Sequence, residues 1–418
     1  MSLSTPRICC LDLDTFFVSV ERLLDPSLVG KPVVVGGAGG TRSALGALGE
    51  RGERGERGVV TSASYEVRAL GVRSGMSLMQ AAELAPGAIF VPTRHGVYSE
   101  YADRVRLIAE NYTPVSQVAS IDEMFLDFSG CENLYSQPSD AGADATIARV
   151  VRKLTDEIQA SVGLPASAGV ATSRSVAKVA CCLAKPRGVL LVAAGTESQL
   201  LAGLPVRRFP GIGPVAEKKL QALGWLTLGD VANAPLAELR RVLGSWAESI
   251  QRGCRGQGAH ELGGGRPAFQ EYDPADCAIG TISNERTFRE DVRDPACIEA
   301  MLCSLCERVC WRARKRGVKA RTVTLKLRYA DFETISRSRT LTPTCSEREL
   351  FPVVRQLFVR SRQRRLAVRL LGIGLSNLGP FDQQLDLFPD DEPLRRAVDD
   401  VRERYGYDAL RSALSGRS

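Results

Sequence analysis

The sequence predicts a multidomain α+β protein, and three observations support this prediction. The chain has 418 residues, which is enough for two to four domains at roughly 100–200 residues per domain. Apolar periods typical of strands and of helices alternate through residues 7–183, as in an α+β or split βαβ unit, whereas residues 195–255 show the helical period alone. A second alternation of helices and strands runs through residues 295–375.

Each element of the first part has its own signal. Residues 7–13, RICCLDL, form a short apolar run with β character, and a helical pattern follows through Phe17 and Leu24. The stretch Gly36–Gly58, which ends in GERGERGERG, has too few triplets for a collagen-like helix and predicts a solvated loop or insertion. The other patterns predict strands at 31–35, 118–128 and 166–171, and helices at 65–70, 77–84, 97–111, 143–162 and 173–183.

The second part begins with the helical residues 195–255, which short turns interrupt. A linker rich in Gly and Pro covers residues 256–274. After it, the patterns predict helices at 295–316 and 347–358, strands at 322–329 and 367–375, and a last helix that begins at Pro393.

Positive charge is concentrated in one segment. Residues 1–275 contain 28 Lys and Arg against 28 Asp and Glu, whereas residues 276–378 contain 21 against 11. Residues 379–418 contain 6 against 9. The excess in the middle segment indicates either a solvated basic surface or a domain that binds a polyanion, most simply nucleic acid.

Composition excludes several classes of protein. Apolar residues make up 44 % of the chain and charged residues 25 %, as in ordinary globular proteins. No apolar run approaches the roughly 18 residues of a membrane helix, and Asp12 and Asp14 interrupt any signal-peptide core near the start. We therefore expect a cytoplasmic protein without a membrane segment. With only His95 and His260 available, catalysis would rest on carboxylates, lysines and arginines rather than on histidine.

Acidic residues end two of the predicted strands. Asp12 and Asp14 follow the first strand and share one face by the period-2 alternation. Asp122 and Glu123 lie in VASIDEMFLDF, where the backbone must turn or bulge if both side chains are to reach one ion. Either pair alone is an ordinary strand-end contact with solvent. Together, three carboxylates on neighbouring strands suit two divalent cations about 3.5–4 Å apart, and their hard oxygen atoms favour Mg²⁺.

Three further motifs suit phosphate groups. In SYEVRALGVRSGM, Tyr65 and Arg68 reach the same side of a predicted helix, where they bind a triphosphate or merely decorate the surface. In LAKPRG, Lys185 lies at a helix end, as a phosphate contact or as a capping cation. FPGIGPVAEKKLQALG resembles a helix-hairpin-helix, whose backbone N–H groups hold a DNA phosphate, with a plain helix–helix turn as the alternative.

Taken in order, these motifs resemble those of Y-family DNA polymerases, closest to the bacterial DNA polymerase IV (DinB-like) branch. DLDTFFVSVE and SIDEMFLD resemble the two carboxylate motifs of the family, ASYEVR its triphosphate motif and AKPRG its phosphate lysine. VTLKLRYADFETISRSRTL resembles the sheet of the family's DNA-binding little finger domain. QLDLF resembles the short peptide with which bacterial polymerases bind the sliding clamp. The resemblance covers residues 7–410.

The resemblance implies a role for each matched residue. Two Mg²⁺ ions would be held by Asp12, the Leu13 carbonyl, Asp122 and Glu123. Phe17 would be the steric gate, which clashes with a 2′-hydroxyl. The incoming nucleotide would be contacted by Phe16, Phe17, Tyr65, Arg68 and Lys185. The residues implied for DNA binding are Gly211, Ile212, Gly213, Lys326, Arg328, Arg337 and Arg339. Those implied for clamp binding are Gln384, Leu385, Leu387 and Phe388.

The implied architecture is a right-hand polymerase. Its parts are a split palm (1–29 and 94–186), small fingers (30–93) with the Gly-rich insertion (36–58), a helical thumb with the helix-hairpin-helix (187–257), a linker (258–275), an α/β little finger (276–378) and a tail with the clamp peptide (379–418).

The implied reaction is template-directed addition of dNTPs to a primer 3′-OH, with low fidelity, bypass of damaged templates and no proofreading. The implied partners are primer-template DNA, dNTP and the bacterial sliding clamp, and we expect a nucleoid-associated monomer. The alternatives are a catalytically inactive damage-response factor of the same fold and a helix-hairpin-helix nuclease or DNA-binding protein. The placement of Phe17 shortly after Asp12, together with Tyr65 and Arg68, favours nucleotide insertion over both.

Overall fold

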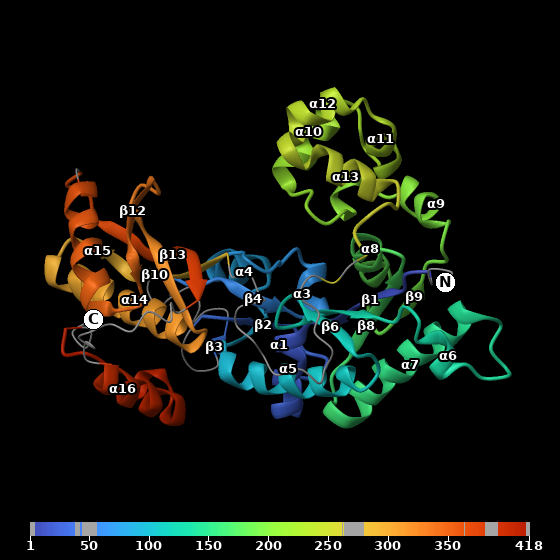
Figure 1. The fold of residues 1–418 in the computed structure, drawn as a ribbon, viewed down its shortest axis with the longest axis horizontal. Helices are drawn as coiled ribbons and strands as arrows, with labels where there is room; N and C mark the ends of the chain where they lie inside the picture. Colours follow the sequence, from blue (N-terminus) through green and yellow to red (C-terminus); the bar gives the residue numbers. More distant parts are fainter. Residues whose placement is uncertain are drawn as a thin grey trace. The chain divides into compact units, whose positions relative to one another are not determined.

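The chain forms two units, Met1–Gln270 and Glu271–Ser418 (Figure 1). The structure is a computed structural model that describes residues 5–37, 42–43, 57–260, 262, 280–362, 364–380 and 392–414. The division between the units falls inside the predicted linker. Within these described ranges, no helix is long and apolar enough to cross a membrane.

A five-stranded sheet in the order β6-β7-β1-β8-β9 forms the centre of the first unit. β1 is the middle strand and runs antiparallel to both of its neighbours. Its sequence ICCLDL is apolar on both faces before Asp12, as expected of a strand that is covered on both sides. The strands are β1 (Ile8–Leu13), β6 (Val115–Val118), β7 (Glu123–Asp127), β8 (Ala166–Ala171) and β9 (Val189–Leu191).

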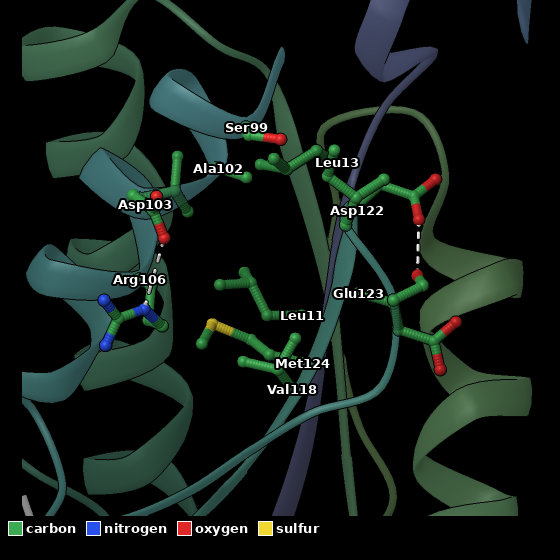
Figure 2. A pocket seen from close by; sticks show the side chains of 13 residues that line it. Leu11, Leu13, Ser99, Ala102, Asp103, Arg106, Val118, Asp122, Glu123 and Met124 are labelled. Carbon is green, nitrogen blue, oxygen red and sulfur yellow. Dashed lines mark hydrogen bonds and ion pairs between the residues drawn. The ribbon is translucent and has the colours of Figure 1, made fainter. Parts of the chain in front are cut away.

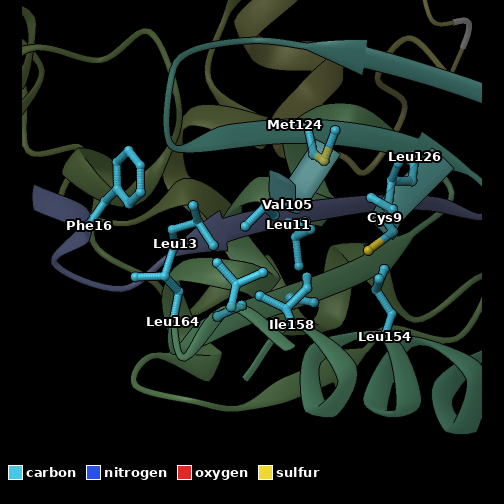
Figure 3. Packing of buried hydrophobic residues seen from close by; sticks show 14 of the residues in the cluster. Cys9, Leu11, Leu13, Phe16, Val105, Met124, Leu126, Leu154, Ile158 and Leu164 are labelled. Carbon is cyan, nitrogen blue, oxygen red and sulfur yellow. The ribbon is translucent and has the colours of Figure 1, made fainter. Parts of the chain in front are cut away.

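Helices cover both faces of this sheet. On one face, Leu11 and Leu13 pack with residues of α1, α5 and α7, among them Leu154 and Ile158 of α7 (Figure 3). On the other face, Cys10 packs with the apolar residues of α8. The helices are α1 (Phe16–Leu24), α5 (His95–Glu110), α6 (Glu132–Tyr135), α7 (Ala143–Val162) and α8 (Arg174–Ala184). The apolar periods therefore predicted the long helices within a few residues.

α8 lies so close to β8 that no side chain fits between the two backbones at Gly169. A Cβ atom added at Gly169 would lie 2.1 Å from the Cys181 nitrogen and 2.2 Å from the Ala177 oxygen. Because real Cβ contacts are never so short, this position requires glycine. The contact fixes which residues of α8 stand over the carboxyl end of β1.

The single strand predicted at 118–128 is wrong, because the chain turns back within it. β6 and β7 are two antiparallel strands with Val118 opposite Met124. The N–H groups of Ala119 and Ser120 both donate to the Glu123 carbonyl, at 2.9 and 3.0 Å, and thereby close a tight turn. The expected break in the backbone before Glu123 is therefore confirmed as a hairpin turn.

A smaller sheet in the order β3-β5-β2-β4 has its own core, in which Val34, Val60 and Phe90 pack with α3 and α4. Most of the insertion predicted at 36–58 lies outside the described residues. The elements are β2 (Val33–Gly36), β3 (Arg42–Ser43), β4 (Val60–Ala63), β5 (Ile89–Val91), α3 (Tyr65–Ala69), α4 (Leu78–Leu84) and the 3₁₀ helix Pro26–Leu28.

The segment predicted to be all helical after residue 195 is helical throughout. Its helices are α9 (Glu197–Ala202), α10 (Pro214–Ala222), α11 (Leu228–Asn233), α12 (Leu236–Leu243) and α13 (Ala247–Cys254), with 3₁₀ turns at Val206–Arg208 and Gly244–Trp246. One boundary needs correction. β9 pairs in parallel with β8, so the central sheet extends past the palm boundary predicted at residue 186.

The second unit is a four-stranded sheet in the order β10-β13-β11-β12, covered on one face by α14 and α15. The patterns did not predict β10, because its sequence TISNERTFREDV lacks an apolar alternation. The strands are β10 (Thr281–Val292), β11 (Val318–Tyr329), β12 (Thr334–Thr344) and β13 (Val368–Pro380). The helices are α14 (Pro295–Lys315), α15 (Glu347–Ser361), α16 (Glu392–Tyr405) and the 3₁₀ helix Tyr407–Ala409.

α16 is held to the rest of the second unit by ion pairs. Arg314 of α14 donates to Asp399 of α16 at 2.6 and 3.0 Å, and also to Glu347 at 2.8 and 2.9 Å. Arg402 of α16 forms a buried ion pair with Glu307 of α14. The tail predicted at 379–418 therefore contains a helix that is part of this unit.

Candidate active site

Asp12 and Glu123 face each other across the two central strands. They are directly opposite in the antiparallel register of β1 and β7. Opposite residues of such a pair point to the same side of the sheet. The N–H group of Leu13 donates to the Asp122 carbonyl at 2.9 Å, which brings the hairpin turn to the end of β1. The structure therefore gathers the segments of all three predicted carboxylates.

The hairpin turn also sets the direction of the carboxylates. In Figure 2, the side chains of Leu11 and Met124 point toward a cavity of about 340 Å³. The carboxylates of Asp122 and Glu123 lie on the opposite side, away from Leu11 and Met124. The Ser120 hydroxyl donates to Asp122 at 2.5 Å and orients it. Two consecutive residues thus share one side because Asp122 belongs to the turn and Glu123 to the strand.

Two lysines from the α8 segment neutralise this acidic group. The Lys178 ammonium donates to both oxygens of Glu123, at 2.9 and 2.6 Å. Lys185, which follows α8, forms an ion pair with Asp12. Burial raises the pKa of Asp12 to about 6; Lys185 opposes the rise, and the charges of Asp122 and Glu123 add to it. The Asp12 carboxylate is therefore stabilised by any cation that approaches it.

Among the described residues, no three His, Cys, Asp or Glu side chains lie close enough together to hold a metal ion. The donor set nevertheless fits a hard divalent cation, because it consists of three carboxylates and one carbonyl. The ammonium groups against Asp12 and Glu123 mark two positions where positive charge is favourable.

A buried carboxylate beside this group joins three segments of the chain. Asp14 is 1 % exposed and accepts hydrogen bonds from the Ser167 hydroxyl at 2.7 Å, the Arg187 N–H at 2.8 Å and the Tyr65 hydroxyl at 3.3 Å. Burial and then the charge of Asp14 raise the pKa of Tyr65 to about 12. The guanidinium of Arg68 lies 5.5 Å from the Tyr65 ring centre. Tyr65, Arg68 and the segment of Lys185 are thus brought together as predicted.

Phe16 and Phe17 begin α1 and have different surroundings. Phe16 is 2 % exposed and belongs to the core, and its predicted contact with a nucleotide stays a prediction. Consecutive helical residues diverge by about 100°, and Phe17 points to a partly buried position where its ring stacks on Tyr98, with 4.1 Å between ring centres. Of the two rings, that of Phe17 is therefore the more accessible to a ligand.

The glycine turn of the helical segment is present, with one correction. Gly211 has a φ of 97°, and Gly213 is the N-cap of α10. Ile212 is 7 % exposed and belongs to a hydrophobic core. Its N–H donates to the Phe209 carbonyl at 3.1 Å. Contrary to the prediction, this N–H group is therefore not available to bind a phosphate.

The four cations predicted to bind DNA in the second unit lie on two sides of its sheet. Lys326 and Arg328 alternate with buried residues of β11 and lie on the face without helices. Lys326 pairs there with Glu285 at 2.8 Å. Arg337 and Arg339 of β12 lie opposite the buried residues Leu325 and Val323, and hence on the helix side at the sheet edge. Spacing alone cannot give this separation, because it depends on the strand register.

The clamp residues Gln384, Leu385, Leu387 and Phe388 lie outside the described residues. Sequence reasoning also missed Lys178, Tyr98 and Glu21, which the geometry brings into the site. It placed Asp14 beside Asp12 but missed its role. Lys178 had a usable signal, because it lies on the helix predicted at 173–183, about two turns before Lys185 at its end. The contacts of Asp14 had none, since its partner Ser167 is 153 positions away.

Family models match three stretches of the chain. Residues 11–182 match the impB/mucB/samB family, residues 195–224 match the IMS family HHH motif, and residues 280–387 match the impB/mucB/samB family C-terminal domain. The second stretch contains the glycine turn, and the first contains every residue of the carboxylate group.

Curated relatives resemble nearly the whole chain. It is 36 % identical over 421 residues to the DNA polymerase IV of Dehalococcoides mccartyi strain CBDB1, with 99 % of both chains covered. It is 36 % identical over 423 residues to the DNA polymerase IV of Caulobacter vibrioides, with 99 % of this chain and 96 % of the relative covered.

Solved structures share the fold. A Y-family DNA polymerase chimera built on Dbh matches with a TM-score of 0.72 and 24 % identity, over 89 % of this chain and 98 % of that one. The insertion ternary complex of Dbh DNA polymerase matches with a TM-score of 0.58 and 25 % identity, over the same shares. The solved structures show the fold, and the 36 % identity to the curated relatives over nearly the whole chain shows the family.

Proposed function

The chain belongs to the Y family of DNA polymerases, on the DNA polymerase IV branch, and is a DNA-directed DNA polymerase of the translesion type; from this premise we propose how its residues perform the reaction. The observation that supports the proposal best is the direct opposition of Asp12 and Glu123 beside the turn that bears Asp122. Chemistry is then a matter of positioning and of neutralising charge, as phosphoryl transfer requires.

Asp12, Asp122, Glu123 and the Leu13 carbonyl are the proposed ligands of two Mg²⁺ ions. When bound, such ions neutralise the attacking 3′-oxygen and the departing pyrophosphate. The buried position of Asp12 strengthens its attraction for cations, because water screens the interaction less there. Ser120 keeps the Asp122 carboxylate directed toward the group.

The triphosphate of the incoming dNTP is proposed to bind Tyr65, Arg68 and Lys185. These side chains come from separate segments, and the hydrogen bonds of Asp14 hold the segments together. A phenol and two cations suit three phosphate groups, and the fork of Arg68 can bind two oxygens at once. Phe17 is the proposed steric gate, because it is the accessible ring of α1 next to Asp12.

Duplex DNA is proposed to contact the glycine turn at Gly211 and Gly213 and the helix-free sheet face with Lys326 and Arg328. Arg337 and Arg339 would add contacts along the sheet edge. Each phosphate contact should steepen the salt dependence of binding by about 0.9 in log–log slope. Low fidelity, synthesis without proofreading and binding of the sliding clamp through Gln384, Leu385, Leu387 and Phe388 belong to the same proposal.

Primer extension on an undamaged template tests the proposal. The full chain should extend a primer with dNTPs and Mg²⁺ but not with rNTPs. Asp122→Ala/Glu123→Ala should reduce extension by at least about a thousandfold, since several kcal/mol of charge stabilisation are lost. Phe17→Ala should admit rNTPs while extension with dNTPs continues.

The control for the carboxylate pair is Asp103→Ala, which removes a carboxylate that lines the cavity from α5, away from the proposed ligands (Figure 2). It should leave extension within about threefold of wild type, as for a surface substitution. A folded, DNA-binding wild-type protein that does not extend primers would instead indicate a catalytically inactive factor of this fold.

A further inference from the structure

The ring of Phe17 is supported from one side by a residue of another helix. Tyr98 of α5 is fully buried, and its ring lies nearly parallel to that of Phe17, at 16° and 4.1 Å between centres. Phe16 meets the same tyrosine edge-on at 6.3 Å, and His95 meets Phe17 edge-on at 6.0 Å. The plane of the Phe17 ring is therefore set chiefly by the plane of Tyr98.

Tyr98 is in turn fixed by a buried carboxylate. Its hydroxyl donates to Glu21 at 2.6 Å. Glu21 lies on α1, one turn after Phe17, and is 2 % exposed. Burial and then the bond to Glu21 raise the pKa of Tyr98, so the phenol stays protonated and keeps donating. α1 and α5 are thus connected twice: the Phe17 ring stacks on the Tyr98 ring, and the Tyr98 hydroxyl donates to Glu21.

Arg94 completes the arrangement. Its Nε donates to Glu21 at 3.0 Å, and its Nη2 forms an ion pair with the second Glu21 oxygen. A buried carboxylate without such a partner is costly, and it would draw in water or change its rotamer. The Arg94 side chain is 44 % exposed, so a substitution there need not open the core.

We propose that Arg94 and Glu21 are positioning residues for sugar selection: they fix Tyr98, and Tyr98 holds the Phe17 ring in the plane in which it excludes a 2′-hydroxyl. The inference rests on the proposed role of Phe17 as the gate. Without the support, the ring can tilt away, and a ribonucleotide gains access although no atom of the gate itself has been removed.

The test compares the ratio of kcat/KM for a dNTP to kcat/KM for the matching rNTP. Arg94→Met should lower this ratio by about five- to tenfold, which corresponds to the loss of one fixed aromatic pair. Tyr98→Phe keeps the stack but removes the bond to Glu21, and it should lower the ratio in the same direction by about two- to fivefold. Both should change kcat/KM for the dNTP by less than about threefold.

The matched control is Arg149→Met. Arg149 forms the same forked pair with Asp140, at 2.9 and 2.7 Å, but contacts no residue of the gate. Its sugar ratio should equal that of wild type, even if its melting temperature falls. The double variant Phe17→Ala/Arg94→Met should have the ratio of Phe17→Ala alone, because there is no ring left to position.

The outcomes separate the two proposals. If Phe17→Ala does not admit rNTPs, the gate assignment itself fails. If Phe17→Ala admits them but Arg94→Met and Tyr98→Phe keep the wild-type ratio, the inference is overturned while the gate stands. Equal losses of kcat/KM for both sugars would also overturn it, since they would assign Arg94 to general nucleotide binding. Should Arg94→Met not fold, Tyr98→Phe alone decides.

Discussion

At the scale of single residues, Asp14 shows how a side chain next to the chemistry serves the site without touching the substrate. It is buried, and its three hydrogen-bond donors come from β8, from the segment after α8 and from α3. The sequence predicted that Asp12 and Asp14 share a face, but not that their roles differ. That difference arises because Ser167 and Arg187 lie against Asp14, whereas Lys185 lies against Asp12.

Asp14→Asn should destabilise the protein and weaken nucleotide binding. An amide presents an NH₂ group to donors that need an acceptor, which leaves at least one buried group unpaired and costs about 1–3 kcal/mol. We expect a lower melting temperature and a several-fold higher KM for dNTP, because Tyr65 and the Lys185 segment lose their common anchor.

Ser167→Ala is the control for this substitution. It removes one donor and leaves Asp14 with two, so the melting temperature should fall by less than in Asp14→Asn. An Asp14→Asn protein with wild-type stability and KM would show that the buried carboxylate anchors nothing.

At the scale of elements, apolar periodicity predicted the helices and strands that bury an apolar face. The bounds of α7 and β8 agree with the patterns because both elements bury a regular apolar stripe or run. The apolar pattern predicted neither β10 nor the β6–β7 turn; a break before Glu123 was expected only from the chemistry of Asp122 and Glu123. β10 buries only Ile282 and Phe288, six residues apart, and is held mainly by its ladder to β13. The turn is made by backbone bonds to Glu123. Interactions between distant strands leave no local pattern.

Gly169→Ala tests the seating of α8. The added methyl group would overlap backbone atoms of α8, which cannot rotate away, so we expect a loss of about 3 kcal/mol or more. The midpoint of urea unfolding measures it. The ion pairs Lys178–Glu123 and Lys185–Asp12 should be disturbed as well, which would reduce primer extension in the folded fraction.

Gly96→Ala in α5 provides the matched control. Nothing lies within 4 Å of a Cβ atom there, and alanine is favoured over glycine inside a helix by about 0.5–1 kcal/mol. This variant should be as stable as wild type or slightly more so. If both alanine variants unfold at the same urea concentration, the close approach of α8 and β8 contributes nothing to the free energy of unfolding.

At the scale of the whole molecule, the segment with the excess of basic residues falls within one of the two units into which the chain folds. The segment with 21 basic and 11 acidic residues, 276–378, lies entirely in the second unit. The predicted clamp peptide follows β13 and precedes α16 in the sequence, and α16 is tied to α14 by Arg314 and Arg402. Both flanks of the peptide therefore belong to the unit proposed to bind DNA.

Capture of the sliding clamp by the full chain should depend on this peptide. Leu387→Ala/Phe388→Ala should reduce capture in a pull-down by at least about tenfold, as expected when apolar anchors of a short motif are removed. Leu394→Ala is the control, because Leu394 is an exposed leucine of α16 outside the motif. Unchanged capture by the double variant would reject the peptide assignment.

The close packing of α8 against Gly169 also limits which mutations this enzyme can accept. Volume added where the two elements meet displaces Lys178 and Lys185 together, so selection acts on the core and on the catalytic charges at once. The small sheet of β2–β5 has a separate core that contains no residue of α8. Lineages that acquire new template preferences should therefore accumulate their substitutions in the small sheet and conserve the interface of α8.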